Sequence, residues 1–330
     1  MKILFILGNG FDIKLGLKTR YANFYDSYVE MDSSCEAVKN LKQSISNSGY
    51  EDWADLELGL GEYTEKIDNP QDGIDIYIDI LYGLQKYLSD EENRYIYDSV
   101  DQDKLFYDLF HPEIYLRWRE KQGVFSHFNR NDEWNLGIIT FNYTKTLERI
   151  LGNPSLPINV SFDDEGPRNL TQIVHIHGYV GDRMILGVND RSQIKKPEWH
   201  NNQRLLRRYV KPLHNDTYKL DHERLSSELI ANSHVICLFG VSIGETDKLW
   251  WEKIANRLNA NSGIRLIIFY FLDSFEPTGN YGPEYEDNVD MVKDRFLTLA
   301  GYNMNHGIRN QIYVTFQKSI FDIELSEMLQ

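Results

Sequence analysis

The alternation of short apolar β-type runs with helical stretches is the feature that most restricts the fold of this chain. The first run, KILFIL, is continuously apolar, as in strands that are buried on both faces of a parallel sheet, and it stops at the glycines of GNGFD. Similar runs return later in the sequence, at residues 136–142, 172–178, 183–188, 234–242, 264–272 and 311–316. This order predicts an α/β fold with a mainly parallel sheet, whose ligands bind at the carboxyl ends of the strands.

A long helical segment separates the first strand from the second. Residues 18–131 are mostly of helical pattern, and they far exceed the length that one βαβ crossover requires. Within them, residues 74–80 alternate with period two as a strand would, but the pattern continues through Leu84 and Leu88 with helical spacing. We therefore expect a core of residues 1–17 and 132–330 with a helical insertion at 18–131, which forms part of the pocket wall or a homo-oligomer contact.

The net charge of −15 is unevenly distributed. Residues 51–100 contain fourteen acidic and three basic side chains, which we interpret as solvated faces of amphipathic helices rather than a partner-binding patch. Residues 191–211 contain seven basic side chains and one acidic one. Their arginines and Lys211 could meet a phosphate, another subunit or water, and water is the favoured interpretation. The acidic total gives no sign of direct nucleic-acid binding.

The cysteines and the apolar runs indicate in which cellular compartment the protein is expected. Cys35 and Cys237 form no CxxC motif, and two unpaired cysteines fit a reducing cytoplasm. The longest apolar runs are about half of the ~20 residues that a membrane-spanning helix needs. The N-terminal run also lacks the length and cleavage site of a signal peptide. We expect a cytoplasmic protein with no membrane partner.

Four strand ends carry residues that packing alone does not require. The first is the turn of Gly8, Asn9, Gly10, Phe11 and Asp12, where glycines permit backbone N–H groups to approach a phosphate at a helix N-terminus. Ile13 occupies the position of the third glycine in the dehydrogenase fingerprint, and no acidic residue ends a second strand about twenty residues later. A hydride-transferring Rossmann enzyme is therefore disfavoured.

The second and third strand ends contain an amide and two imidazoles. Thr140 and Asn142 end the strand in TFNYT, and Asn142 either belongs to a site or caps the helix KTLERIL. His175 and His177 precede Gly178 with a period of two, which places both rings on one face of a strand. Three interpretations remain open for this pair: a structural pair, two metal ligands, or a base with its neighbour.

The fourth strand end is the Gly-x-Ser of a strongly apolar strand. Gly240 and Ser242 suit contacts to a ribose or a phosphate. Asp247, a few residues later, is expected to cap the helix that begins near Lys248.

Together, the motifs LGNGFD, TFNYT, HIHG, LGVND and LFGVSIGETD resemble the bacteriophage abortive infection family AbiH. More distantly, the four strand ends are similar to those of sirtuin and SIR2-like domains, which bind NAD on a Rossmann-like sheet and cleave its nicotinamide–ribose bond. The resemblance implies catalytic roles for Asn142 and His177. The cofactor-binding residues that it implies, or that adjoin those motifs, are Gly8, Asn9, Gly10, Phe11, Asp12, Thr140, Gly240 and Ser242.

Departures from the sirtuin pattern narrow the expected reaction. Thr144 replaces an aspartate, Asn9 replaces the small middle residue of the glycine turn, and the zinc-binding CxxC pairs are absent. Protein deacetylation is therefore disfavoured, and the resemblance implies hydrolysis of NAD as a substrate without a metal, with a phage component as trigger. A metal-dependent hydrolase using both histidines and a non-catalytic nucleotide sensor or interaction subunit remain as alternatives.

Overall fold

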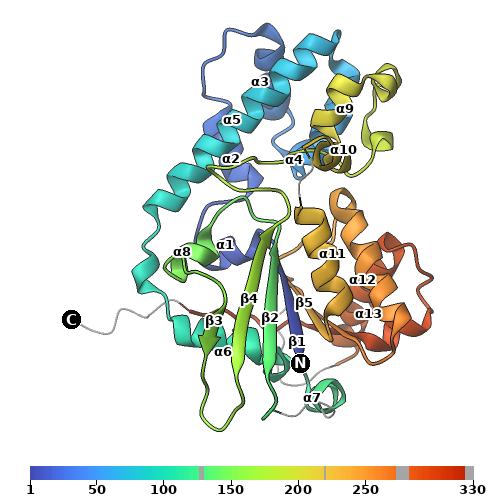
Figure 1. Ribbon diagram of the computed structural model, residues 1–330. Helices are drawn as coiled ribbons and strands as arrows, with labels where there is room; N and C mark the ends of the chain where they lie inside the picture. The colour runs from blue at the N-terminus through green and yellow to red at the C-terminus, as the bar shows by residue number, and fades with distance from the viewer. Residues whose placement is uncertain (126–129, 219–220, 273–281, 324–330) are drawn as a thin grey trace.

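A seven-stranded sheet forms the centre of the computed structural model, which describes residues 1–125, 130–218, 221–272 and 282–323 (Figure 1). Its strand order is β3-β4-β2-β1-β5-β6-β7, and all neighbours are parallel except the antiparallel pair of β3 and β4. The strands are β1 Lys2–Leu7, β2 Trp134–Thr140, β3 Ile158–Val160, β4 Arg168–His175, β5 Val235–Phe239, β6 Arg265–Phe269 and β7 Ile312–Thr315. The prediction of an α/β fold with a mainly parallel sheet is confirmed.

β1 lies at the middle of the sheet and is buried on both faces, as its unbroken apolar sequence predicts. Ile3, Phe5 and Leu7 pack into one hydrophobic core, and Leu4 and Ile6 pack into the core on the opposite face. The chain adds β2 to β4 on one side of β1 and β5 to β7 on the other. The strand order therefore reverses between β1 and β5, which is where doubly wound sheets bind ligands.

Helices cover both faces of the sheet. The face that contains Phe5 packs against α1 Gly10–Lys14, α6 Gln102–Phe110, α7 Trp118–Phe125 and α8 Thr146–Ile150. The opposite face packs against α11 His222–Asn232, α12 Lys248–Ala260 and α13 Pro283–Leu299.

A helical lobe with its own hydrophobic core lies above the carboxyl ends of the strands (Figure 1). Its helices are α2 Tyr21–Tyr28, α3 Glu36–Asn47, α4 Leu56–Tyr63, α5 Pro70–Arg94, α9 Gln203–Tyr209 and α10 Lys211–Tyr218. The segment at 74–80 is thus helical, as its longer pattern favours. The helices within residues 18–131 pack in two regions. α2 to α5 form part of the lobe, and α6 and α7 cover one face of the sheet.

The strands of the structure differ from the predicted ones in two places. Residues 183–188 form no strand, although Met184, Leu186 and Val188 are buried in the core of the lobe. Their backbone is satisfied instead by single contacts, in which Ile185 N donates to His177 O and Val188 N donates to Tyr209 O. Burial, rather than sheet pairing, explains this apolar run. The sequence analysis also missed β3, a short edge strand of mixed exposure.

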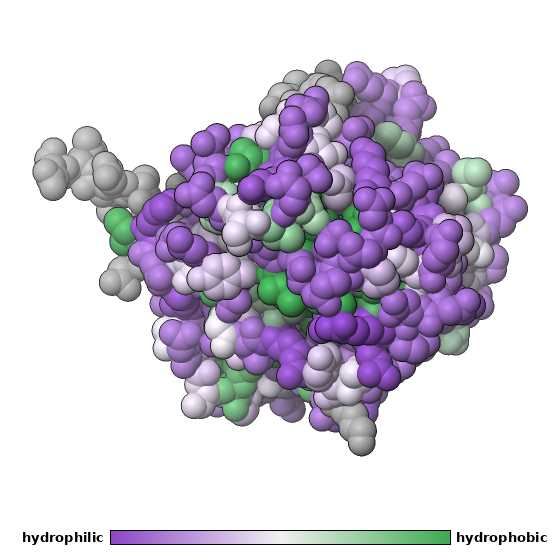
Figure 2. Space-filling model, turned by 90° about the horizontal axis from the view of Figure 1, so that it is seen from above, coloured by the Kyte–Doolittle hydropathy of each residue, from purple (hydrophilic) through white to green (hydrophobic). Residues whose placement is uncertain are grey.

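The surface of the described part of the chain is mostly polar. Seen from above, hydrophilic side chains cover most of the lobe, and apolar ones show between them (Figure 2). None of the described helices combines the length and apolar character that crossing a membrane requires.

Candidate functional site

The ends of β1 and β5 meet through glycines at the point where the strand order reverses. Gly8 N donates to Phe239 O, and Gly10 N donates to Gly240 O, both at 2.9 Å. A Cβ atom on Gly10 would lie 2.4 Å from the Gly240 Cα, and Gly240 has a φ of +68°. Glycine is therefore required here because two backbones touch.

This contact engages the backbone N–H groups that were predicted to bind a phosphate. The N–H groups of Gly8, Gly10 and Phe11 all donate to backbone carbonyls, and α1 is only five residues long. The Phe11 side chain is buried against Phe239, and Asn9 holds the following loop through Thr19. Pyrophosphate binding at this turn stays a prediction.

Asp12 is the centre of a buried polar cluster beside this turn. Its side chain is 1% exposed, and its Oδ2 atom accepts a 2.5 Å hydrogen bond from Thr144 Oγ1. Burial raises the pKa of Asp12 to about 6, against the opposing effect of the hydrogen bond from Thr144 and of the nearby polar side chains of Thr146 and Asn142. The cluster joins the end of β1 to the loop after β2.

In the loop after β2, alternate side chains face Asp12 and Glu57. Asn142 and Thr144 face the Asp12 cluster, whereas the Tyr143 hydroxyl donates to Glu57 Oε1 at 3.1 Å. Thr140 fixes the loop, since its hydroxyl accepts from Asn142 N at 3.0 Å. Asn142 does not cap the next helix, because α8 begins after Lys145 and has no side-chain cap. The capping interpretation of Asn142 is therefore wrong.

His177 follows the end of β4 and is held by a carboxylate. Its Nε2 atom lies 3.0 Å from Asp247 Oδ1, and the ring is buried. Gly178, with a φ of +67°, then turns the chain so tightly that a Cβ atom would lie 1.6 Å from Arg183 O. The tight turn at Gly178 thus determines the position of His177.

Asp247 is the last residue before α12, but its side chain does not cap that helix. The same Oδ1 atom that faces His177 lies 2.8 Å from Lys211 Nζ. Capping was the favoured interpretation, and it is wrong because this partly buried carboxylate pairs with the buried Lys211 cation instead of the helix N–H groups.

Lys211 and Glu57 extend this chain of contacts into the helical lobe. Lys211 Nζ lies 2.8 Å from Glu57 Oε2, and Glu57 Oε1 accepts from the Tyr143 hydroxyl and, at 3.3 Å, from Gly187 N. Lys211 and Glu57 are 4% and 5% exposed. Solvent was the favoured partner of Lys211 in the basic stretch, and the structure corrects that interpretation.

The charges of this group set its protonation. Burial lowers the pKa of His177, and the nearby Lys211 cation lowers it further, although Asp247 opposes both effects. Burial would raise the pKa of Asp247, but Lys211 and the contact with His177 hold it below its ordinary value. At neutral pH an ionised Asp247 therefore faces a neutral imidazole. Because a carboxylate can only accept, the His177 proton lies on Nε2, and Nδ1 has a free lone pair.

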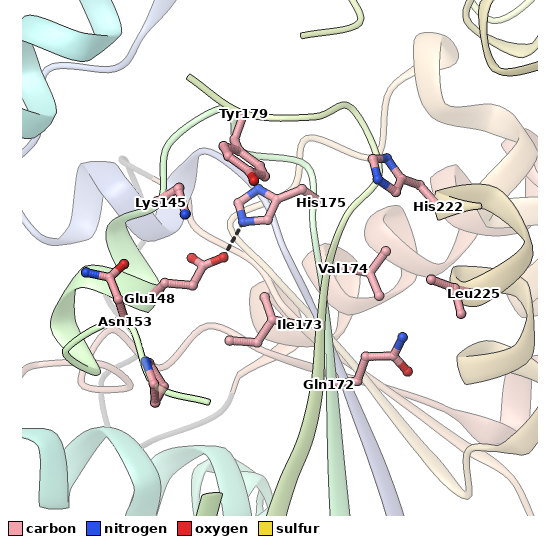
Figure 3. A pocket seen from close by; sticks show the side chains of 11 residues that line it. Lys145, Glu148, Asn153, Gln172, Ile173, Val174, His175, Tyr179, His222 and Leu225 are labelled. Atoms are coloured by element: carbon pink, nitrogen blue, oxygen red, sulfur yellow. Dashed lines mark hydrogen bonds and ion pairs between the residues drawn. The ribbon is translucent and has the colours of Figure 1, made fainter. Parts of the chain in front are cut away.

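His175 stands in a different environment from His177. Its Nε2 atom lies 2.6 Å from Glu148 Oε1, and its Nδ1 atom lies 3.1 Å from Asn142 O. The His175 ring and Glu148 point toward each other in a cavity of about 410 Å³ along the edge of β4, which Lys145 and His222 also line (Figure 3). Both nitrogens of His175 face oxygen acceptors, so neither can take a proton from a substrate.

The two histidines do not form a metal site with their neighbours. Within the described ranges, no three His, Cys, Asp or Glu side chains are grouped so that they could hold a metal ion. His175 lines the large cavity, whereas His177 lines a separate one of about 10 Å³ that is bordered by Lys211, Asp247 and Trp250. Of the three interpretations of the pair, a base at His177 with a structural neighbour fits these contacts best.

The structure brings only part of the expected site together. Asn142 joins Asp12, and His177 joins Asp247, while Ser242 is exposed beyond the turn at Gly240. Glu57 was not among the predicted site residues, although it contacts both Lys211 and Tyr143. One signal was present, since Glu57 is an acidic residue within the otherwise apolar LELGLG, whose burial shows that its charge needs a partner.

Comparison with known protein families gives a match over most of the chain. The family model described as Bacteriophage abortive infection AbiH matches residues 4–270, which include every residue of both clusters. No curated protein matches the chain. The resemblance to this family is confirmed, and the more distant resemblance to SIR2-like domains stays a prediction.

Proposed function

Because the chain belongs to the bacteriophage abortive infection family AbiH, and so acts in phage defence, we propose that it does so by hydrolysing NAD to nicotinamide and ADP-ribose. The observation that carries this proposal is the buried His177, whose Nε2 atom is held by Asp247 at the carboxyl edge of the sheet. A SIR2-like relationship, which rests on the four strand ends, names the substrate.

His177 has the properties of a general base. A histidine that is neutral at pH 7, oriented by a carboxylate through one nitrogen, offers the other nitrogen to a proton. The same logic of a base and an orienting carboxylate recurs in unrelated hydrolases. His175 lacks this property because Glu148 and Asn142 O engage both of its nitrogens.

The proposed reaction needs a base and no strong acid. Water attacks C1′ of the nicotinamide ribose, and the C1′–N bond breaks with its electron pair going to the ring nitrogen. Nicotinamide then leaves as a neutral molecule, because its ring was cationic in NAD. The proton of the attacking water passes to Nδ1 of His177 and from there to solvent. The remaining task is to position water against the ribose.

Asn142 and the glycine turn have supporting parts in the proposal. The Asn142 side chain has an Oδ1 atom that is buried without a hydrogen-bond partner, and it lies at the carboxyl end of β2. It would orient the ribose or the attacking water. Gly8 to Asp12 lie at the reversal of strand order, the place where a dinucleotide would lie across the sheet.

Substrate access requires movement in this proposal. The cavity beside His177 has a volume of about 10 Å³, which is room for about one water molecule and not for a nucleotide. The lobe and the sheet edge must therefore separate when NAD binds. A trigger that favours this opening would admit NAD to His177 during infection.

The test is release of nicotinamide from NAD by the purified protein, alone and with extract of phage-infected cells. Wild type is expected to release nicotinamide and ADP-ribose in equal amounts. His177→Ala should lower the rate at least about 100-fold, since a general base contributes about 10²–10⁴. His306→Ala is the matched control, because His306 caps the turn before β7 and packs against Tyr302, outside the groups around His177 and Asp12, and should leave the rate unchanged.

Other outcomes assign other functions. NAD that stays intact under both conditions with wild type overturns hydrolysis, and binding without turnover indicates a nucleotide sensor. Activity that needs added zinc or manganese and is lost equally in His175→Ala and His177→Ala would indicate a metal hydrolase.

A further inference from the structure

Four charged or ionisable side chains form one continuous chain from the helical lobe to His177. Glu57 on α4 contacts Lys211 on α10, Lys211 contacts Asp247 before α12, and Asp247 contacts His177 after β4. The distances are 2.8, 2.8 and 3.0 Å, and Lys211 and His177 meet at the same Asp247 oxygen.

Burying these charged groups lowers the stability of the fold. Removing ions from water costs several kcal/mol each, and apolar side chains of similar size often replace buried ion pairs without loss of stability. Here the ends of Lys211 and Glu57 are almost completely buried. The pair of Lys211 and Glu57 lies next to the proposed base, because Lys211 also contacts the carboxylate that holds His177.

The local fold is built to bring Lys211 and Glu57 to this place. Asp55 caps α4 by accepting from Glu57 N and Leu58 N, which puts Glu57 in the first turn. Val188 and Val210 pair as an isolated bridge, and Lys211 N donates to Val188 O at 2.9 Å. Both side chains therefore start from fixed backbone.

We infer that Lys211 is a positioning residue for His177: it holds the Asp247 carboxylate in place and, held in turn by Glu57, keeps the imidazole uncharged and ready to accept a proton. This inference rests on the proposed function for its catalytic meaning. The effect on the His177 ring itself is independent of any substrate.

Every element packed around His177 brings a titratable group that must be counted. Besides Asp247, Lys211 and Glu57, these groups are Asp55, Tyr21, Tyr143 and His222. Burial holds the pKa of Tyr143 and of Tyr21 well above the ordinary range, so both stay neutral. Burial also lowers the pKa of His222, so Lys211 is the cation that faces the base at neutral pH.

The sign of the effect follows from these charges. Without Lys211, the His177 ring would face the ionised Asp247 carboxylate with no compensating cation. An imidazolium would then be stabilised, its Nδ1 atom would carry a proton, and the base would be blocked. Without the charge of Glu57, the cation would be less compensated, and the ring would be still harder to protonate.

The test is an NMR titration of the histidine rings in the full chain, in which the His177 signal is identified by its loss in His177→Gln. In Lys211→Met the pKa of His177 is expected to rise by about one unit or more, the usual effect of removing a charge within about 6 Å. Lys211→Arg should keep it within a few tenths of a unit. Lys195→Met, an exposed lysine of the same segment, is the matched control.

Glu57→Gln keeps the inference testable if Lys211→Met does not fold. It predicts the opposite sign, a His177 pKa that is unchanged or lower than in wild type. A His177 pKa that is the same in Lys211→Met and wild type, or that rises in Glu57→Gln, overturns the inference. Because the titration needs no substrate, its outcome is separate from failure of NAD hydrolysis. If hydrolysis occurs, the acid limb of its pH–rate profile should shift in Lys211→Met by the same amount as the titration.

Discussion

Asp12 shows how one buried carboxyl can set a pH dependence. Its side chain is enclosed beside the glycine turn, and burial raises its pKa from 3.8 to about 6. The folded state therefore binds this proton more tightly than the unfolded state does. The stability that results is complete below about pH 4 and is lost as the pH rises through about 6.

Asp12→Asn removes this titration. The free energy of unfolding of wild type, minus that of the variant, should fall by about 2–3 kcal/mol between pH 4 and pH 7, since each pKa unit corresponds to 1.36 kcal/mol. Urea unfolding at a series of pH values measures it. The exposed Asp287→Asn is the control and should show no such slope. A difference that stays flat from pH 4 to pH 7 in Asp12→Asn would show that Asp12 is not buried in this way.

The contact of β1 with β5 gives a prediction at the scale of elements. Gly10→Ala places a Cβ atom where the Gly240 backbone lies, and backbone cannot move aside as a flexible side chain can. We expect a loss of about 1–3 kcal/mol in the free energy of unfolding, as for other overpacked sites.

Gly123→Ala is the matched control for this substitution. Gly123 lies in α7, and its nearest atom to an added Cβ is the Tyr313 hydroxyl at 3.5 Å, so alanine fits there and should stabilise by up to about 1 kcal/mol. Equal effects of the two substitutions would refute close packing of the two strand ends.

Elements with a strong local pattern could be predicted from the sequence, and those defined by distant contacts could not. The continuous apolar run of β1 and the helical spacing that α5 shows through Leu84 and Leu88 predict these elements, and the structure contains both. Residues 183–188 have the composition of a strand, but among the described residues they pair only through the single bridge of Val188 with Val210. Their burial, which produced the apolar pattern, comes from tertiary packing that the local sequence does not encode.

The site divides in the same way. His177 is recognisable because it adjoins the glycine of a strand end, and the motif is local. Asp247, Lys211 and Glu57 come from three separate segments: Lys211 is 36 residues from Asp247 and 154 residues from Glu57 in the sequence. Each of them has a plausible local role as a helix cap or a solvated charge, and only the fold brings them to one histidine.

At the scale of the whole molecule, the lobe and the sheet are joined by contacts that must open for a nucleotide. Val180 N donates to Tyr143 O at 2.7 Å, and Ile185 N donates to His177 O at 2.8 Å. If these contacts open without global unfolding, their amide hydrogens should exchange through a local opening of lower free energy than that of β1.

Native-state hydrogen exchange measures this difference. The amides of Val180 and Ile185 should exchange faster than those of Ile6 and Leu238 in the central strands, and their exchange should change when NAD is added. Equal protection of all four amides, with and without NAD, would mean that the lobe does not separate and that the nucleotide has no access to His177.

The most direct measurement of the central claim is the NAD content of bacteria that express the chain during phage infection. The account predicts that NAD falls and nicotinamide appears before the infected cells release phage, and that both changes disappear in His177→Ala together with protection. Cells in which wild type blocks the phage while NAD stays constant would contradict the account and separate abortive infection by this protein from NAD cleavage.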